Sequence, residues 1–308
     1  MSRLEDLIQN HPTRRSEAQK AAFREDIIAD LSTRGYAASV EVNGGKHKNV
    51  VVGDPTGAEV VLTAHYDTPA ASLFPNIMIP RARVLFYLYQ FLPVILLLVV
   101  SLGLSYLFGM VLLEKYEAYL IGFLILYYGG YFLMFRTFEN KNNYNDNTSG
   151  VAAVLSVADA LGEADKDKVA FILFDNEERG KKGSKAYFAD HKDGMQDRVV
   201  INLDCVGNGD HIVFISKPQV QEKPIYKSLQ ASFESADGFT VHFYSSKEAD
   251  ANSDHKSFPL GVGCMACGRS KHGVLFAGRI HTARDVVAKD ENIEFLTRGM
   301  LKFVSTVG

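Results

Sequence analysis

The sequence contains few cysteines and begins without an apolar segment. Its three cysteines, Cys205, Cys264 and Cys267, are too few for a disulfide framework. Cys264 and Cys267 have C-x-x-C spacing, but the pair stands alone in an apolar run, which favours core packing over metal or redox chemistry. The opening stretch "MSRLEDLIQNHPTRR" is charged and lacks the apolar region of a signal peptide. These features together predict a reducing, cytoplasmic setting.

Strong net charge and sequence repeats are also absent. The formal net charge is −3 over 308 residues, so the composition gives no reason to expect nucleic acid or an acidic partner. No internal repeat or low-complexity segment is visible, and the length suffices for one large core or two smaller ones.

Charged residues are missing from two long segments in the middle of the chain. Residues 84–113 form a run of 30 uncharged residues, and residues 118–135 form another of 18, with "EKYE" between them. About 20 apolar residues span a bilayer core, so we expect residues 84–135 to form an inserted hydrophobic hairpin of two transmembrane helices. Pro93 and the Gly129–Gly130 pair leave a shallow re-entrant hairpin open. The same runs could also form a buried helical pair or an interface with a second copy of the chain.

Outside this segment, short β-branched runs alternate with amphipathic stretches that have helical spacing. This alternation predicts an α/β fold, a three-layer α/β/α arrangement around a mostly parallel mixed sheet, built by residues 1–83 and 136–308 as one discontinuous domain. Strands are expected at 38–42, 48–53, 59–65, 168–174, 198–204, 210–215 and 239–244, and helices at 16–31, 148–162, 183–191, 224–236 and 292–307.

Side chains that can bind metals follow the predicted strands or lie in the loops between elements. Functional groups in such sheets gather beyond the carboxyl ends of the strands, so these side chains are expected on one rim. They are His65 and Asp67 in "TAHYDT", Asp146 in "NDNTSG", Glu177 and Glu178 in "FDNEERG", Asp204 in "INLDCVG", and His281 in "RIHTARD".

The order of these motifs resembles the zinc-dependent aminopeptidases and carboxypeptidases of metallopeptidase family twenty-eight (M28). The resemblance covers about residues 37–83 and 136–307, and "GKKGS" and "SDHKSF" add to it. It implies peptide hydrolysis by an enzyme with two Zn²⁺ ions, for which Co²⁺ or Mn²⁺ are possible substitutes. Removal of N-terminal residues is the expected reaction.

The resemblance also implies a role for each motif residue. Asp146 would bridge both metals, and the Asp146–Asn147 peptide bond would be a candidate for the cis form. Glu177 would be the general base, and Asp67 would hold the His65 ring through its free N–H. The remaining ligands divide between the metals, with His65 and Asp204 on one and Glu178 and His281 on the other.

The inserted hairpin departs from the family pattern, because His65 and Asp146 lie 81 positions apart. Both flanks carry expected ligands, so the hairpin must leave and return at one rim and the active site should open near the membrane surface. The flanks contain Arg81, Arg83, Arg136 and Lys141, whereas the tip has one Lys and two Glu. The positive-inside tendency then predicts a membrane protein whose catalytic domain faces the cytoplasm.

Several functions stay open at this point. A carboxypeptidase or dipeptidase of the same fold would need a cation for the terminal carboxylate, and Arg179, Lys181 and Lys182 follow the expected base. A catalytically inactive membrane scaffold or receptor would be a function of another class, although such relatives typically lose metal ligands. A glutaminyl-cyclase-like activity is disfavoured, since those relatives use one zinc ion and lack the histidine that His65 supplies.

Overall fold

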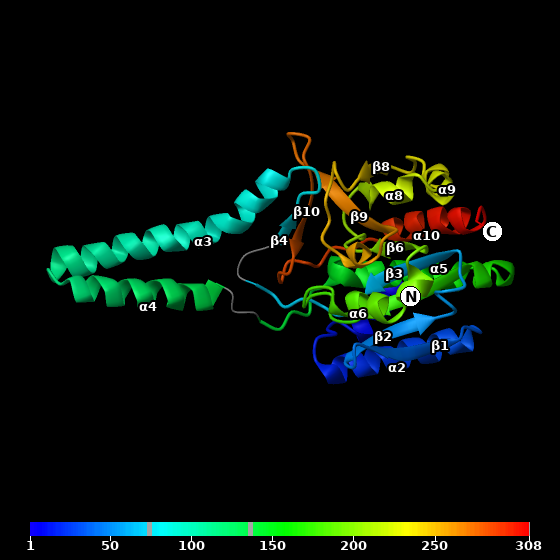
Figure 1. Cartoon of the computed structure of the whole chain (residues 1–308), viewed down its shortest axis with the longest axis horizontal. Helices are drawn as coiled ribbons and strands as arrows, with labels where there is room; N and C mark the ends of the chain where they lie inside the picture. Colours follow the sequence, from blue (N-terminus) through cyan, green and yellow to red (C-terminus); the bar gives the residue numbers. More distant parts are fainter. Residues whose placement is uncertain (73–75, 135–137, 308) are drawn as a thin grey trace.

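The β-branched runs form one mixed sheet in the computed structural model, which describes residues 1–72, 76–134 and 138–307 (Figure 1). The described residues form ten strands in the order β1-β2-β5-β3-β6-β9-β10-β4, with β7 pairing to both β8 and β9. The four central strands β5, β3, β6 and β9 run parallel, and antiparallel pairs lie on both sides of them. The strands are β1 (Ala38–Asn43), β2 (His47–Val52), β3 (Val60–His65), β4 (Asn76–Met78), β5 (Val169–Phe174), β6 (Val199–Leu203), β7 (His211–Ser216), β8 (Thr240–Ser245), β9 (Gly261–Arg269) and β10 (Leu275–Ile280).

Helices cover both faces of the sheet and produce the expected three layers. One face packs against α1, α2, α5, α9 and α10, and the other packs against α6 and α7. Val60 and Leu62 of β3 point to the first face while Val61 points to the second, as the two-residue period of a strand requires. The helices are α1 (Arg3–Asn10), α2 (Glu17–Thr33), α3 (Arg83–Tyr106), α4 (Tyr116–Met134), α5 (Gly150–Ala160), α6 (Lys182–Asp190), α7 (Lys192–Met195), α8 (Pro218–Gln221), α9 (Pro224–Ser232) and α10 (Asp290–Val304), with shorter or irregular helical turns η1 (Leu107–Leu112), η2 (Tyr144–Ser149), η3 (Glu163–Lys168) and η4 (Asp254–Ser257).

The predicted α/β fold is confirmed, and the elements that were not anticipated include α1, β4, β9 and β10, together with the short helices α7 and α8. Strand β9 has the sequence "GVGCMACGR", whose glycines and cysteines give little strand signal. Cys264 and Cys267 lie three positions apart on this strand, so they enter different clusters of the core on opposite faces. Both are buried, and their contacts are those of core packing.

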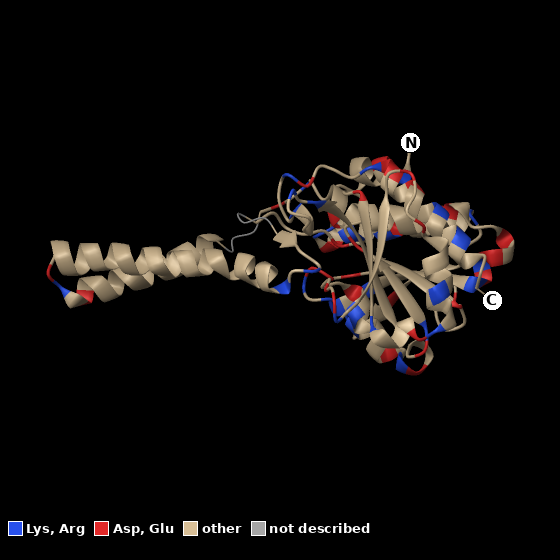
Figure 2. Ribbon diagram, turned by 90° about the horizontal axis from the view of Figure 1, so that it is seen from above, with Lys and Arg blue, Asp and Glu red and all other residues tan. Residues whose placement is uncertain are grey.

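Helices α3 and α4 project from the domain as a long antiparallel hairpin (Figure 1). Residues Arg83–Leu112 and Tyr116–Met134 are long and apolar enough to cross a membrane, and only 17% and 6% of their most apolar windows are buried. The hairpin is therefore not a buried helical pair of the domain core. Figure 2 shows charged residues at its tip and at its base next to the domain, with none along the helices between.

Replacing Gly183 with Ala should destabilise the domain, because Gly183 starts α6 in direct contact with the end of β5. A Cβ there would lie 2.1 Å from the Asp175 carbonyl oxygen and 2.6 Å from the Asn49 side-chain oxygen. Overpacking of this kind costs roughly 1–3 kcal/mol, and the atom in contact is backbone, so we expect the upper part of that range. Thermal unfolding of the full-length protein measures the effect. Gly162→Ala is the matched control, since nothing lies within 4 Å of its Cβ, and a similar loss of stability in both variants would contradict the prediction.

Candidate active site

The parallel order of the central strands brings three of the predicted motifs to one edge of the sheet. His65 is the last residue of β3, Glu177 and Glu178 follow β5, and Asp204 follows β6, with β3 paired to both β5 and β6. Asp146 comes from the irregular turn η2 and His281 follows β10. These six side chains line one cavity of about 380 Å³.

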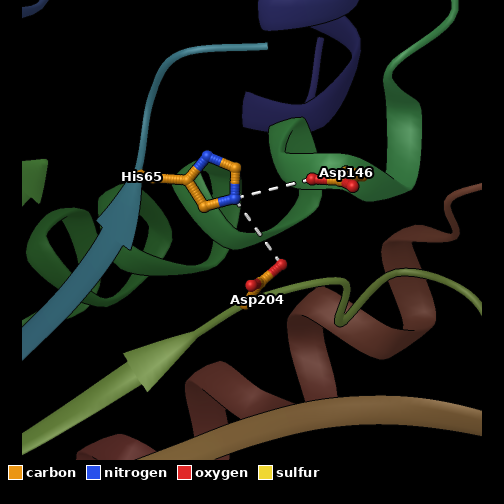
Figure 3. A group of neighbouring side chains, drawn as sticks. All are labelled: His65, Asp146 and Asp204. Atoms are coloured by element: carbon orange, nitrogen blue, oxygen red, sulfur yellow. Dashed lines mark ion pairs between the residues drawn. The ribbon is translucent and has the colours of Figure 1, made fainter. Parts of the chain in front are cut away.

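Asp146 lies between the two histidines and presents a different oxygen to each. Its Oδ1 is 3.5 Å from Nε2 of His65, and its Oδ2 is 3.1 Å from Nε2 of His281. Asp204 lies 3.7 Å from the same nitrogen of His65, as Figure 3 shows, and Glu178 lies 3.3 Å from Nε2 of His281. The side chains therefore form two groups that share Asp146.

The donor set of both groups fits zinc. His65, Asp146 and Asp204 offer one nitrogen and two oxygen ligands within 4.8 Å of one another, and so do Asp146, Glu178 and His281. Mixed nitrogen and oxygen ligands of this kind suit Zn²⁺. The Oδ1 atom of Asp204 is buried and accepts no hydrogen bond from any residue that the structure describes, so it is available to a cation.

The electrostatics of the site also favour positive charge. Burial lowers the pKa of His65, but the adjacent Asp146, Asp204 and Asp67 carboxylates outweigh it and raise that pKa well above its ordinary value. Burial likewise opposes the ionised form of Asp146, yet hydrogen bonding to His281 and His65 holds its pKa below the usual range. A cluster that stabilises imidazolium in this way stabilises a divalent cation by the same field.

Asp67 supports the site differently from the expected role. The Nδ1 atom of His65 lies 3.0 Å from the Asp67 backbone carbonyl, whereas the Asp67 carboxylate is 3.7 Å away. The carboxylate instead accepts the backbone N–H groups of Glu177 and Glu178, at 2.9 and 3.2 Å. The predicted carboxylate–histidine bond is therefore replaced by a carbonyl contact, because the side chain of Asp67 turns toward the loop after β5.

A second carboxylate fixes the loop that carries Asp146. Asp285 accepts the backbone N–H groups of Asn145 and Asp146, both at 3.0 Å. The Asp146–Asn147 peptide bond is cis, as the resemblance implied. The Asn147 side chain bonds to the backbone of Leu203, Gly150 and Cys205, which connects the loop to the end of β6.

Glu177 lies beside the two groups and has no fixed partner. Its carboxylate is within 4.8 Å of the ligand atoms of His65 and Glu178. Over the part of the chain that the structure describes, neither a hydrogen bond nor an ion pair holds it. Burial, together with the charges of Asp254, Glu178 and Asp204, raises its pKa well above the ordinary value, although His65 opposes this.

The sequence predictions missed Asp285 and Asp254 as supporting residues. Burial raises the pKa of each to about 7, with Asp146 adding to the shift of Asp285 and Asp67 to that of Asp254. Asp254 accepts a hydrogen bond from the Ser184 hydroxyl at 2.5 Å, while its other oxygen is buried with no hydrogen-bond donor among residues 1–72, 76–134 and 138–307. Asp285 occurs in "RIHTARD" and Asp254 in "SDHKSF", two motifs that the sequence analysis had already connected with the family. Their place in these motifs could have identified them, whereas their contacts could not be read from the sequence.

Known proteins resemble this chain in sequence profile and in fold. The profile described as peptidase family M28 matches residues 137–303. A zinc-dependent exopeptidase from Parabacteroides distasonis has 15% identity and a TM-score of 0.60, covering 99% of this chain and 97% of its own. The LapA aminopeptidase of Legionella pneumophila has 12% identity and a TM-score of 0.56, covering 98% and 69%. A glutaminyl cyclase from Porphyromonas gingivalis has 14% identity and a TM-score of 0.57, covering 99% and 96%.

These likenesses have different weight. The profile match confirms the family resemblance drawn from the motifs. The structural likenesses, all at 15% identity or below, establish the zinc exopeptidase fold and leave the reaction to be argued from the site. A comparison with curated protein sequences found no match.

Replacing Asp146 with Ala should remove both metal ions, because the two groups share this residue. Full-length protein loaded with zinc and dialysed should contain two ions per chain by elemental analysis, and Asp146→Ala well below one. His281→Ala should lose only one ion, since the His65 group stays complete. Asp167→Ala is the control, because Asp167 is an exposed carboxylate in η3, at the end of β5 opposite to the site. An Asp146→Ala variant with the metal content of the wild type would show that the shared-ligand interpretation is wrong.

Proposed function

The chain belongs to peptidase family M28, and from this membership we propose that it is a zinc-dependent aminopeptidase that removes N-terminal residues from peptides with two metal ions. Membership supports metal-dependent hydrolysis of peptide bonds. The observation that carries the finer proposal is the placement of Asp146, whose two oxygens face two separate histidines 3.5 and 3.1 Å away. A shared carboxylate of this kind is what a two-metal site requires.

In the proposed site, His65 and Asp204 would hold one ion, Glu178 and His281 would hold the other, and Asp146 would be shared by both. When bound, the two zinc ions polarise the scissile carbonyl and acidify the attacking water. Residues of the hairpin and of the loops after β5 and β8 also line the cavity. The cavity therefore offers both polar and apolar groups to a bound peptide end.

Glu177 is the proposed general base. It takes a proton from the attacking water and passes it to the leaving amine. Two features support this role: its carboxylate lines the cavity beside the ligand atoms of His65 and Glu178, and no described residue immobilises it. Asp67 acts on the same doublet as a positioning residue, because its carboxylate accepts both backbone N–H groups of Glu177 and Glu178.

The choice of peptide end rests on the groups around the cavity. The fold is shared with a neighbour described as an aminopeptidase, which favours the N-terminal end. Lys181 favours the carboxypeptidase alternative, because it lines the cavity and is held by the side-chain oxygen of Asn252 at 2.7 Å. Arg179 and Lys182, which could also bind a terminal carboxylate, lie together at a different pocket near α2. The inactive scaffold is disfavoured, because all five proposed ligands and the base are present.

We also propose that α3 and α4 insert into a lipid bilayer, as a hairpin domain (residues 84–135) within one discontinuous peptidase domain (residues 1–83 and 136–308). Their exposed apolar surfaces and the absence of charge between base and tip support this. The cations Arg81 and Arg83 at the base support a cytoplasmic catalytic domain. A second copy of the chain is the alternative partner for the same surface.

Glu177→Gln should abolish hydrolysis and keep the metals, since the amide has nearly the same shape and cannot accept the proton. A fall in kcat of roughly 10²–10⁴-fold is expected, with zinc content unchanged. The assay uses aminoacyl-coumarin substrates with a free N-terminus and, separately, N-acetylated dipeptides with a free C-terminus, each with and without chelator. An active variant would contradict the role of Glu177. Cleavage of only acetylated peptides with a free C-terminus would favour the carboxypeptidase alternative.

Membrane insertion predicts that the full-length protein sediments with membranes and resists extraction by high salt and by alkaline carbonate. Detergent should release it, because the hairpin buries its apolar surface in lipid. Recovery of the full-length protein as a soluble monomer without detergent would refute the proposal. In sealed inside-out vesicles, external protease should digest the catalytic domain if it faces the cytoplasm.

A further inference from the structure

The first turns of the hairpin form part of the wall of the catalytic cavity. Arg83, Phe86, Tyr87 and Gln90 of α3 line the same cavity as the proposed metal ligands. Their spacing is i, i+3, i+4 and i+7, so they occupy one face of the helix. The helix that carries the membrane segment therefore presents its first two turns to the site.

This part of α3 extends beyond the end of its hairpin partner. Close approaches of Gly109 to Tyr119 and of Gly130 to Leu97 set the antiparallel register of the two helices. That register places Met134, the last residue of α4, near Pro93 of α3. Residues 83–92 have no part of α4 opposite them, and Pro93, which interrupts helical hydrogen bonding, lies at the junction. The helix thus has two parts: residues 83–92, before Pro93, border the cavity and are called the site-directed part, and the residues after Pro93 form the proposed membrane part.

Contacts at both ends hold the site-directed part against the domain. The Arg83 guanidinium donates to the Ser246 carbonyl oxygen at the end of β8. Gln90 donates to the side-chain oxygen of Asn76 in β4 at 3.0 Å. Phe86 and Tyr87 lie between these two contacts, so their position over the cavity is fixed by the domain.

The lining of the cavity has a polar part and an apolar part. The polar part includes the proposed ligands and Glu177. The apolar part consists of Phe86, Tyr87, Met78, Ile79 and Ile280, the last of which directly precedes the proposed ligand His281. Phe86 and Tyr87 meet edge to face at 5.5 Å, and Tyr87 keeps 54% of its surface exposed. When an apolar group of a substrate covers exposed aromatic surface, both are removed from water and binding becomes more favourable.

We infer that residues 83–92 of α3 are a specificity wall, and that Phe86 and Tyr87 select peptides with a large apolar N-terminal residue. The inference rests on the proposed aminopeptidase activity. When the scissile bond lies at the proposed metal ligands and Glu177, the N-terminal side chain of the peptide can contact the apolar part of the cavity lining. The inserted hairpin is thus part of the substrate site as well as the proposed membrane anchor.

The test compares kcat/KM for leucyl, phenylalanyl and alanyl coumarin substrates, using full-length protein in lipid nanodiscs. The wild type should prefer the leucyl and phenylalanyl substrates. Phe86→Ala should lower the ratio of leucyl to alanyl kcat/KM about tenfold. In a hydrophobic pocket, one methylene more or less on the substrate changes kcat/KM by roughly 10–200-fold, and loss of the Phe86 ring removes part of such a pocket. The loss should appear mainly in KM, with zinc content unchanged. Phe86→Leu, which restores an apolar side chain, should recover most of the ratio.

Phe91→Ala is the matched control, since Phe91 lies on the same segment, is 59% exposed and does not line the cavity. It should leave the ratio unchanged. An unaltered ratio in both Phe86→Ala and Tyr87→Ala, in protein that unfolds at the wild-type temperature, would overturn the inference while leaving the aminopeptidase proposal intact. A zinc-loaded wild type that cleaves none of the free N-terminal substrates would instead refute the proposed function, and the inference with it.

Discussion

The repulsion among buried carboxylates is the constraint on which this structure depends. Asp146, Glu178 and Asp204 converge with Glu177 on one cavity at the edge of the sheet, where burial makes uncompensated charge costly. The two histidines offset this repulsion in the structure, and zinc would offset it in the proposed enzyme. Arg14 lies fully buried beneath the site and bonds to Tyr66, His11 and Thr148; burial lowers its pKa to about 10, although Asp67 and Asp146 oppose this.

The backbone around the site is held by side chains that do not themselves bind metal. Asp67 accepts two N–H groups of the loop after β5, and Asp285 accepts two N–H groups of the loop that carries Asp146. A buried ion pair between Lys20 and Asp175, at 2.6 Å, joins α2 to the first residue after β5. The loop that carries Glu178 and the loop that carries Asp146 are therefore each connected to a distant element, and such outer contacts fix the orientation of ligands.

In the proposed enzyme, the hairpin changes which substrates this family fold can recognise. It is inserted between the proposed ligands His65 and Asp146, so its base has to pass the rim of the site. The surplus length of α3 over α4 is then placed over the cavity, and a helix built for an apolar environment supplies an apolar wall. In this interpretation, location near the membrane and substrate preference arise from a single insertion.

The sequence by itself determined most strands and helices of the domain, the hairpin, the family and the six side chains that line the candidate site. These follow from local periodicity, from runs of uncharged residues and from metal-competent side chains placed after apolar strands. Tertiary structure alone decided which oxygen of Asp146 faces which histidine, that the Asp67 carboxylate holds the glutamate doublet, and that Phe86 and Tyr87 border the site. It also decided β9, whose glycines and cysteines carry little local preference for a strand. Such features depend on contacts between residues far apart in the chain, and these contacts form only when the sheet and its loops pack together.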